Sequence, residues 1–74
     1  MYYIIICEKA TGIILELDGK TRFIKTDTNT RPSISFDNIS EAEDKAHILV
    51  MENDNLEIGI YDATWSFIKR VIKN

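Results

Sequence analysis

The sequence predicts an α+β protein in which one helix packs on one face of an antiparallel sheet of four to five strands, in the chain order β-β-β-α-β-β. Three observations predict this fold class. Residues 2–7, YYIIIC, combine aromatic and β-branched side chains without polar alternation, as in a strand covered on both faces. Asp18-Gly19 separates two apolar segments, which is a strong hairpin signal. Between Ser40 and Glu52, apolar residues recur with helical spacing.

The length and composition predict a single soluble domain over residues 1–74. A chain of this size buries only about 60 % of the surface that its unfolded form exposes, so it has no material for a second core. Its 45 % hydrophobic and 28 % charged content is typical of a folded protein. The single cysteine fits a reducing compartment, and no stretch reaches the roughly 18 apolar residues of a membrane span. We therefore expect a cytoplasmic protein without a membrane contact.

The hairpin should join residues 13–17 to residues 20–26 through a two-residue type I′ turn at Asp18-Gly19, which requires positive φ at both turn residues. This turn sets the register of the two strands. The predicted pairs are Ile14 with Phe23, Ile13 with Ile24, Leu15 with Arg22 and Glu16 with Thr21. The residues expected over the core are Ile13, Leu15, Leu17 and Ile24. Residues 27–35, DTNTRPSIS, should follow as a loop.

The helix should begin at Ser40, because Glu43 follows three residues later and completes a capping box. At about 100° per residue, one narrow face should pack on the sheet. That face consists of Ala42, Ala46, Leu49 and Val50. After the helix, residues 56–62 alternate as a half-buried strand. Residues 64–73 fit either a helix or a strand, and their aromatic and β-branched content favours a strand.

The opposite helix face carries apolar residues that a helix with one neighbour would expose to water. That face consists of Asp44, His47, Ile48 and Met51. Either the loop of residues 27–35 covers it, or it binds a partner, for which a flexible methionine is well suited. Ile14 and Phe23 form a second apolar contact on the sheet face away from the helix. Together with Tyr3 and Ile5 they call for a cover, which a homodimer would provide.

Basic residues fall into two groups, which could form one phosphate-binding strip if their strands are close. The strip would consist of Arg22, Lys25, Lys69 and Arg70. The net charge of −3 argues against a dedicated nucleic-acid binder. Lysine and arginine on edge strands also have a simpler role, because they block aggregation.

The sequence predicts no enzyme, no cofactor and no metal site. Cys7 and His47 are the only nucleophile and base candidates, and no orienting group can be assigned to them. One cysteine and one histidine cannot supply the four ligands of a zinc site. Gly19-Lys20-Thr21 is similar to the end of a phosphate-binding P-loop, but Ile14 stands where that motif needs a glycine.

The succession YYIIICEKATG, ILELDGKTRF, SEAEDKAHILV and LEIGIYD resembles the compact α+β proteins encoded in the early regions of bacteriophages. Such proteins commonly bind and disable a host factor, including CRISPR effectors and other defence proteins, or sequester a signalling nucleotide. The resemblance therefore implies a non-enzymatic, anti-CRISPR-like inhibitor that binds a host protein in the host cytoplasm. The alternative is a small homo-oligomer that binds a nucleotide or short nucleic acid at the basic strip.

Overall fold

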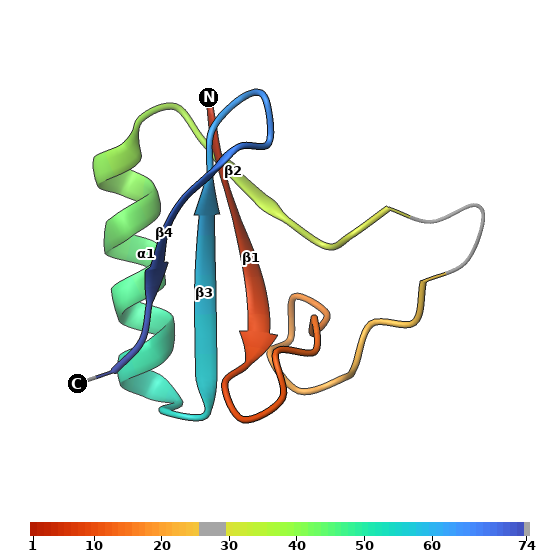
Figure 1. Cartoon of the computed structure of the whole chain (residues 1–74). Helices are drawn as coiled ribbons and strands as arrows, with labels where there is room; N and C mark the ends of the chain where they lie inside the picture. The colour runs from red at the N-terminus through yellow and green to blue at the C-terminus, as the bar shows by residue number, and fades with distance from the viewer. Residues whose placement is uncertain (26–29, 74) are drawn as a thin grey trace.

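The fold is a four-stranded antiparallel sheet with one helix across one face (Figure 1). The computed structural model describes residues 1–25 and 30–73. Its elements are β1 (Tyr2–Glu8), β2 (Ile34–Phe36), α1 (Ile39–Glu52), β3 (Leu56–Tyr61) and β4 (Phe67–Val71). The strand order in the sheet is β2-β1-β3-β4. The predicted α+β class and the final strand are confirmed.

The predicted chain order is wrong, because the described chain runs β-β-α-β-β. Residues 13–25 form isolated bridges rather than two full strands, and β2 lies in the segment expected to be a loop. Two segments share one edge of β1. Strand β2 pairs with Tyr2–Ile4, whereas Ile13 and Leu15 bond to the other half through Glu8 N–H to Ile13 O and Leu15 N–H to Ile6 O, both 2.8 Å. Each segment has half an edge to pair with, so each stays short.

The hairpin has the predicted register but a different turn. Leu15 lies opposite Arg22, and Phe23 N–H donates to Ile14 O at 2.8 Å. Gly19 has φ of 72°, but Asp18 is not left-handed, which excludes a type I′ turn. The Asp18 carboxylate instead accepts hydrogen bonds from the backbone N–H groups of Lys20 and Thr21 and from the Thr21 hydroxyl. The end of the predicted second strand, residue 26, lies outside the described residues.

The hairpin supplies less of the core than expected. Leu15 is buried, but Ile13, Leu17 and Ile24 are exposed, so their predicted place over the core is wrong. Leu15 is adjacent to β1 and can reach the helix side of the sheet. Leu17 lies in the turn and Ile24 near the end of the described hairpin, and both side chains are more than half exposed there.

The core lies between the two central strands and α1. Ile4 and Ile6 of β1 and Ile58 and Ile60 of β3 are fully buried. They pack against the predicted helix face, of which Ala42, Ala46 and Val50 are buried and Leu49 is partly buried. The two alanines allow the helix to lie close to the sheet.

The N-cap of the helix lies two residues earlier than predicted. Asn38, not Ser40, is the N-cap: its Oδ1 accepts from Glu41 N–H at 2.9 Å, and its Nδ2 donates to Glu41 Oε1 at 2.8 Å. The pair has the spacing of a capping box, but Glu41 accepts from the Asn38 side-chain amide, whereas the glutamate of a capping box accepts from the N-cap backbone N–H. Starting at Ile39 also brings that side chain to a half-buried position.

Candidate functional site

Four aromatic side chains gather on the sheet face opposite α1. Tyr3 and Tyr61 are cross-strand partners on β1 and β3, and they alternate with the isoleucines that face the helix. Trp65 stacks on Tyr3 with ring centroids 4.3 Å apart and planes 12° from parallel. Tyr61 contacts both Trp65 at 5.8 Å and Phe67 edge-on at 5.7 Å. We call these four residues the aromatic surface.

The aromatic surface corrects one expectation from the sequence. Ile5 is 2 % exposed and Tyr3 lies under Trp65, so the chain itself covers these two positions. The cover is incomplete, because Trp65 is 44 % and Phe67 60 % exposed. Trp65 falls within residues 64–73, which fit either a helix or a strand in the sequence, and its place on this surface was not predicted.

The loop between β3 and β4 holds Trp65 in place. Asp62 N–H donates to Ser66 O at 3.0 Å, and Trp65 N–H donates to Asp62 O at 2.9 Å. The Asp62 carboxylate accepts from the N–H and hydroxyl of Thr64 and from Ser66 N–H. These bonds, the Thr64 hydroxyl first, lower the pKa of Asp62. The result is a hydrogen-bonded hairpin loop built from the sequence DATWS.

Trp65 has a left-handed backbone, with φ of 64°. Three-residue hairpin loops commonly place glycine at the left-handed position, because a Cβ there costs about 1–2 kcal/mol. Trp65 is the one non-glycine residue of the described chain with positive φ. Asp62, followed by Thr64 and Ser66, is the signal that could have identified this loop from the sequence, because one carboxylate can accept the backbone N–H groups that follow it.

A hollow of about 360 Å³ adjoins Trp65, lined by Thr30, Arg31 and Ser33 from the segment before β2. It places a guanidinium and two hydroxyl-bearing residues next to an exposed indole. Tryptophan, tyrosine and arginine are the residue types enriched in the parts of protein interfaces that contribute most to binding.

The predicted partner-binding face of α1 is exposed. Ile48 is 51 % and Met51 64 % exposed, and Asp44 and His47 are exposed as well. The alternative, that the loop of residues 27–35 covers Ile48 and Met51, is not what the described residues show, and residues 27–29 of that loop lie outside them. A binding role for this face stays a prediction. This helix face points away from the sheet, whereas the aromatic surface lies on the sheet face opposite α1.

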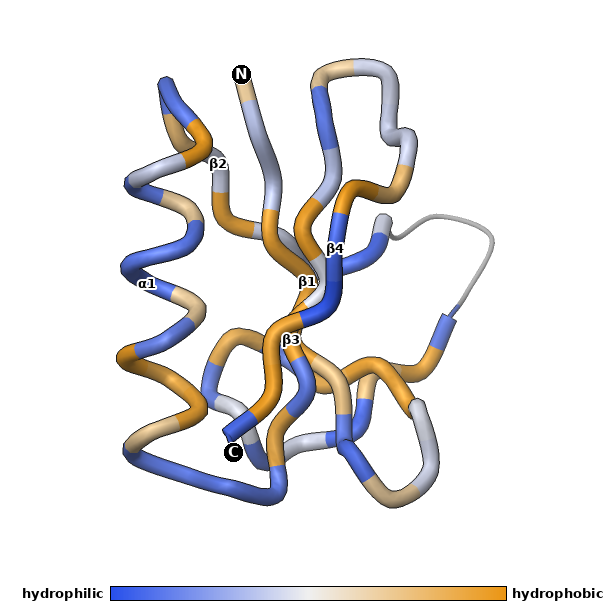
Figure 2. The backbone as a smooth tube through the Cα atoms, turned by 60° about the vertical axis from the view of Figure 1, so that its left-hand side comes forward, coloured by the Kyte–Doolittle hydropathy of each residue, from blue (hydrophilic) through white to orange (hydrophobic). Residues whose placement is uncertain are grey.

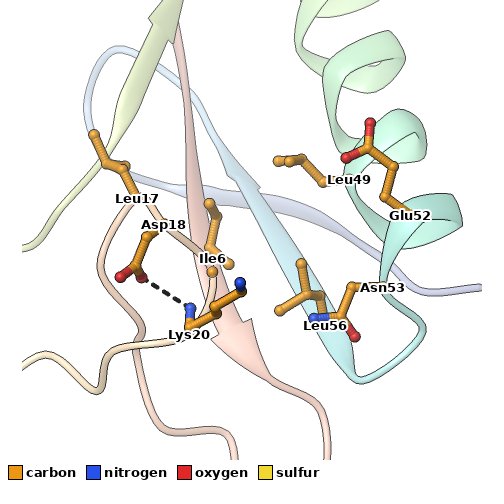
Figure 3. Close-up of a pocket in the computed structure, with 9 residues that line it drawn as sticks. Ile6, Leu17, Asp18, Lys20, Leu49, Glu52, Asn53 and Leu56 are labelled. Carbon is orange, nitrogen blue, oxygen red and sulfur yellow. Dashed lines mark hydrogen bonds between the residues drawn. The ribbon is translucent and has the colours of Figure 1, made fainter.

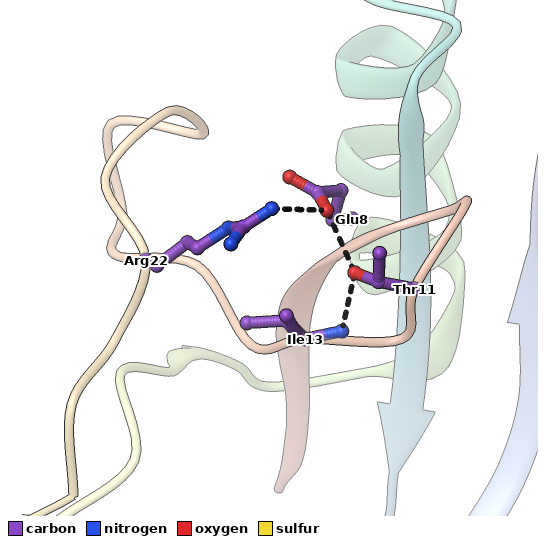
Figure 4. Close-up of polar contacts among 4 residues, drawn as sticks. All are labelled: Glu8, Thr11, Ile13 and Arg22. Carbon is purple, nitrogen blue, oxygen red and sulfur yellow. Dashed lines mark hydrogen bonds and ion pairs between the residues drawn. The ribbon is translucent and has the colours of Figure 1, made fainter.

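The basic residues do not form one strip. Arg22 lies on the hairpin outside β1, where it pairs with Glu8 at 3.1 Å, and Glu8 also accepts from the Thr11 hydroxyl (Figure 4). Lys69 and Arg70 lie on β4, at the other edge of the sheet. Lys25 is exposed in the segment after the hairpin.

Ile14 and Phe23 remain half-buried neighbours across the hairpin, as the register predicts. The proposed second apolar contact is therefore present as a pair, and its role in binding stays a prediction.

Cys7 and His47 lie on opposite sides of the sheet, so they form no catalytic pair. Cys7 alternates with the core residue Ile6 and faces away from α1, whose outer side carries His47. Burial, and then the Glu57 carboxylate, raise the pKa of the Cys7 thiol, while Arg31 lowers it. A thiol with a raised pKa is a poor nucleophile. Among the described residues, no group of three histidine, cysteine or acidic side chains could hold a metal ion.

A second cavity, of about 280 Å³, lies between the hairpin turn and the end of α1 (Figure 3). Its apolar wall is formed by Leu17, Leu49 and Leu56, and Lys20 and Glu52 carry the charges. The Asp18 carboxylate beside it is already occupied by its hydrogen bonds to Thr21 and Lys20, which lower its pKa to about 2. The other polar side chains of its lining are Lys20, Glu52 and Asn53.

Comparison of the chain with family models, curated proteins and solved structures found no match. Within residues 1–25 and 30–73, the single helix is too short and too polar to cross a membrane.

Proposed function

We propose that this chain is a non-enzymatic interaction protein that binds a partner protein through the aromatic surface. The observation that carries the proposal is the left-handed, 44 % exposed Trp65. Glycine would remove the backbone cost at this position, so the indole itself must matter. Strained residues of this kind cluster at functional sites, and an exposed stacked indole is a suitable anchor for a partner.

The charge distribution favours a protein partner over a nucleic acid. The net charge is −3, and the basic residues Arg22, Lys69 and Arg70 lie at opposite edges of the sheet instead of in one strip. Nucleic-acid binding by stacking normally combines aromatic rings with a positive groove. Here the aromatic rings have Arg31 as their basic neighbour, together with hydroxyl-bearing residues, which suits a mixed protein surface.

The resemblance to small phage-encoded proteins suggests which partner class to test first. On that basis we propose a host protein, and a defence protein in particular, as the target that the chain would inhibit by occupying a surface. The exposed helix face of Asp44, His47, Ile48 and Met51 is the competing contact surface within the same proposal.

Affinity capture with matched variants tests the proposal. The full chain is immobilised, a captured host protein is identified and purified, and its affinity is measured by calorimetry. Phe67→Thr should weaken binding at least tenfold, because it removes a 60 % exposed ring and keeps a strand-forming residue. Ile24→Thr is the control, since Ile24 is 75 % exposed and lies outside both surfaces.

One result would contradict the aromatic surface as the contact, and another would contradict a host protein as the partner. Full affinity of Phe67→Thr, with loss of binding in Ile48→Asp/Met51→Asp, would assign binding to the helix face. Light scattering that shows a dimer which Phe67→Thr dissociates would identify the partner as a second copy of the chain.

A further inference from the structure

Strand β4 is an open edge of the sheet. Among the described strands it pairs only with β3, so backbone N–H and C=O groups of alternate residues point away from the sheet. Its residues from Phe67 to Arg70 are exposed. Figure 2 shows a polar centre between two apolar ends. In sequence these are Phe67-Ile68, Lys69-Arg70 and Val71-Ile72.

A standard interface needs more area than the aromatic surface alone offers. Such an interface buries about 800 Å² on each partner, and the whole chain exposes 4893 Å². Phe67 belongs both to the aromatic surface and to β4, so the edge strand continues the same contact area. A partner bound over Trp65 and Phe67 therefore meets the open edge next.

The edge is unsuited to a second copy of itself. In a symmetric antiparallel β4 pair, residues of the helix face must lie opposite residues of the helix face. One such register sets Lys69 against Lys69 of the second copy, and the next sets Arg70 against Arg70. Shifting once more sets Lys69 against Lys73. Each of these central registers opposes like charges, which destabilises the pair.

The same cations favour an acidic strand. From Ala63 to Asn74 the sequence has three cations, Lys69, Arg70 and Lys73, and no carboxylate. Lys69 bonds Glu43 at 2.6 Å and Arg70 bonds Glu57 at 2.9 Å. Their side chains are still 44 % and 59 % exposed, and exposed ion pairs contribute little to stability. Both cations can therefore pair with a carboxylate of a strand that binds along the edge.

We infer that β4 binds an extended segment of the partner protein as a fifth strand, whose core is two adjacent acidic residues flanked on both sides by apolar residues. One acidic side chain lies opposite Lys69 on the helix side of the sheet, and the other lies opposite Arg70 on the aromatic side. Main-chain hydrogen bonds give the affinity, and alternate side chains give the specificity. The inference rests on the proposed function, because it names the partner's chemistry at the same surface.

Peptide titration of the isotope-labelled full chain, followed by backbone amide NMR, tests the inference. The probe is a capped peptide with the core Val-Ile-Glu-Glu-Val-Ile. We expect saturable shifts concentrated on β4 and binding at least tenfold tighter than for the same peptide with two lysines. A peptide N-methylated at alternate residues should lose binding, because it cannot donate along the edge.

Protein variants separate charge from fold. Lys69→Glu/Arg70→Glu should reverse the peptide preference, and Lys69→Thr/Arg70→Thr, which keeps strand-forming residues, should abolish it. Lys9→Glu/Lys20→Glu makes the same change in net charge at exposed loop positions and should leave the preference unchanged. Circular dichroism verifies that each variant is folded.

Three results would overturn the inference: equal binding of the acidic and basic peptides, unchanged binding of the N-methylated peptide, or shifts away from β4. Its failure can be told apart from failure of the proposed function. If Phe67→Thr releases the captured partner but Lys69→Thr/Arg70→Thr does not, the inference fails and the aromatic surface stands. If the acidic peptide binds β4 as expected but Phe67→Thr retains the partner, the aromatic surface is rejected instead.

Discussion

Two substitutions of Trp65 test whether its left-handed backbone is strained. Trp65→Ala and Trp65→Gly both remove the indole, but only alanine keeps a Cβ at φ of 64°. We expect the glycine variant to be more stable than the alanine variant by about 1 kcal/mol. At an ordinary strand or helix position the order is reversed, because glycine loses more conformational freedom on folding.

Both variants lose the free energy of unfolding that the covered area of the indole ring contributes. A tryptophan buries up to about 250 Å², and Trp65 is 44 % exposed, so about 140 Å² is covered. At about 25 cal/mol per Å² this corresponds to about 3.5 kcal/mol, an upper value because the unfolded chain also covers part of the ring. We therefore expect the free energy of unfolding to fall by about 3 kcal/mol in Trp65→Ala and by about 2 kcal/mol in Trp65→Gly.

Urea unfolding followed by far-UV circular dichroism measures both values, because Trp65 is the single tryptophan and neither variant has indole fluorescence. A difference of about 1 kcal/mol corresponds to about 4–8 °C in Tm for a domain of this size. Ala63→Gly is the control: it lies in the same loop without positive φ and should be destabilised. A glycine variant at position 65 that is no more stable than the alanine variant would refute the argument from strain.

Three further outcomes are expected. Asn38→Ala should lower the free energy of unfolding by about 1 kcal/mol because the N-cap is lost, whereas Ser40→Ala should be nearly neutral in the same urea titration. The folded-state pKa of Asp18 is lowered from 3.8 to about 2, so its ionisation adds stability above pH 4 that is lost as the pH falls toward 2. The Tm of Asp18→Asn should accordingly change less than that of the native chain between pH 2 and 4, and equal slopes would contradict the assignment. The raised pKa of Cys7 predicts slower reaction with a disulfide reagent at pH 8 than for a free cysteine thiol, and an equal rate would show that the thiol is not buried.

The elements that the sequence predicts correctly are those with long patterns of their own. Strand β1 is a continuous run of aromatic and β-branched residues, α1 repeats apolar residues at helical spacing and β3 alternates, and the composition of the last segment favoured β4. Strand β2 has three residues in a segment rich in serine and threonine, and it becomes a strand only because Tyr2–Ile4 of β1 lies beside it. Competition for that edge is a long-range property that local patterns do not contain.

The helix start shows how two local signals can compete. Both Asn38 with Glu41 and Ser40 with Glu43 satisfy the spacing of a capping pair. The sequence does not distinguish these two N-caps, because a helix that starts at either one places the same alanines on the core face. In the folded chain, Asn38 is the cap and Ile39 becomes the first residue of the helix.

Trp65 escaped prediction because its conformation opposes its propensity. Tryptophan favours strands and disfavours positive φ, so residues 64–73 read as a single strand. The Asp62 carboxylate, with its bonds to Thr64 and Ser66, closes a loop that places Trp65 over Tyr3. Stacking on a ring that is distant in the sequence decides the orientation of the indole.

Covering the sheet and binding a partner involve overlapping residues, which determines how the function can be tested. Trp65 shields Tyr3 and is itself exposed, so its removal weakens the fold and the contact surface together. Phe67 contacts Tyr61 only edge-on and is 60 % exposed, so its ring contributes less to the core. A change in affinity on replacing Phe67 therefore reports on the surface, whereas a change on replacing Trp65 also includes the stability of the fold. If a partner binds at this face, Phe67→Thr weakens binding while its melting temperature stays close to that of the native chain.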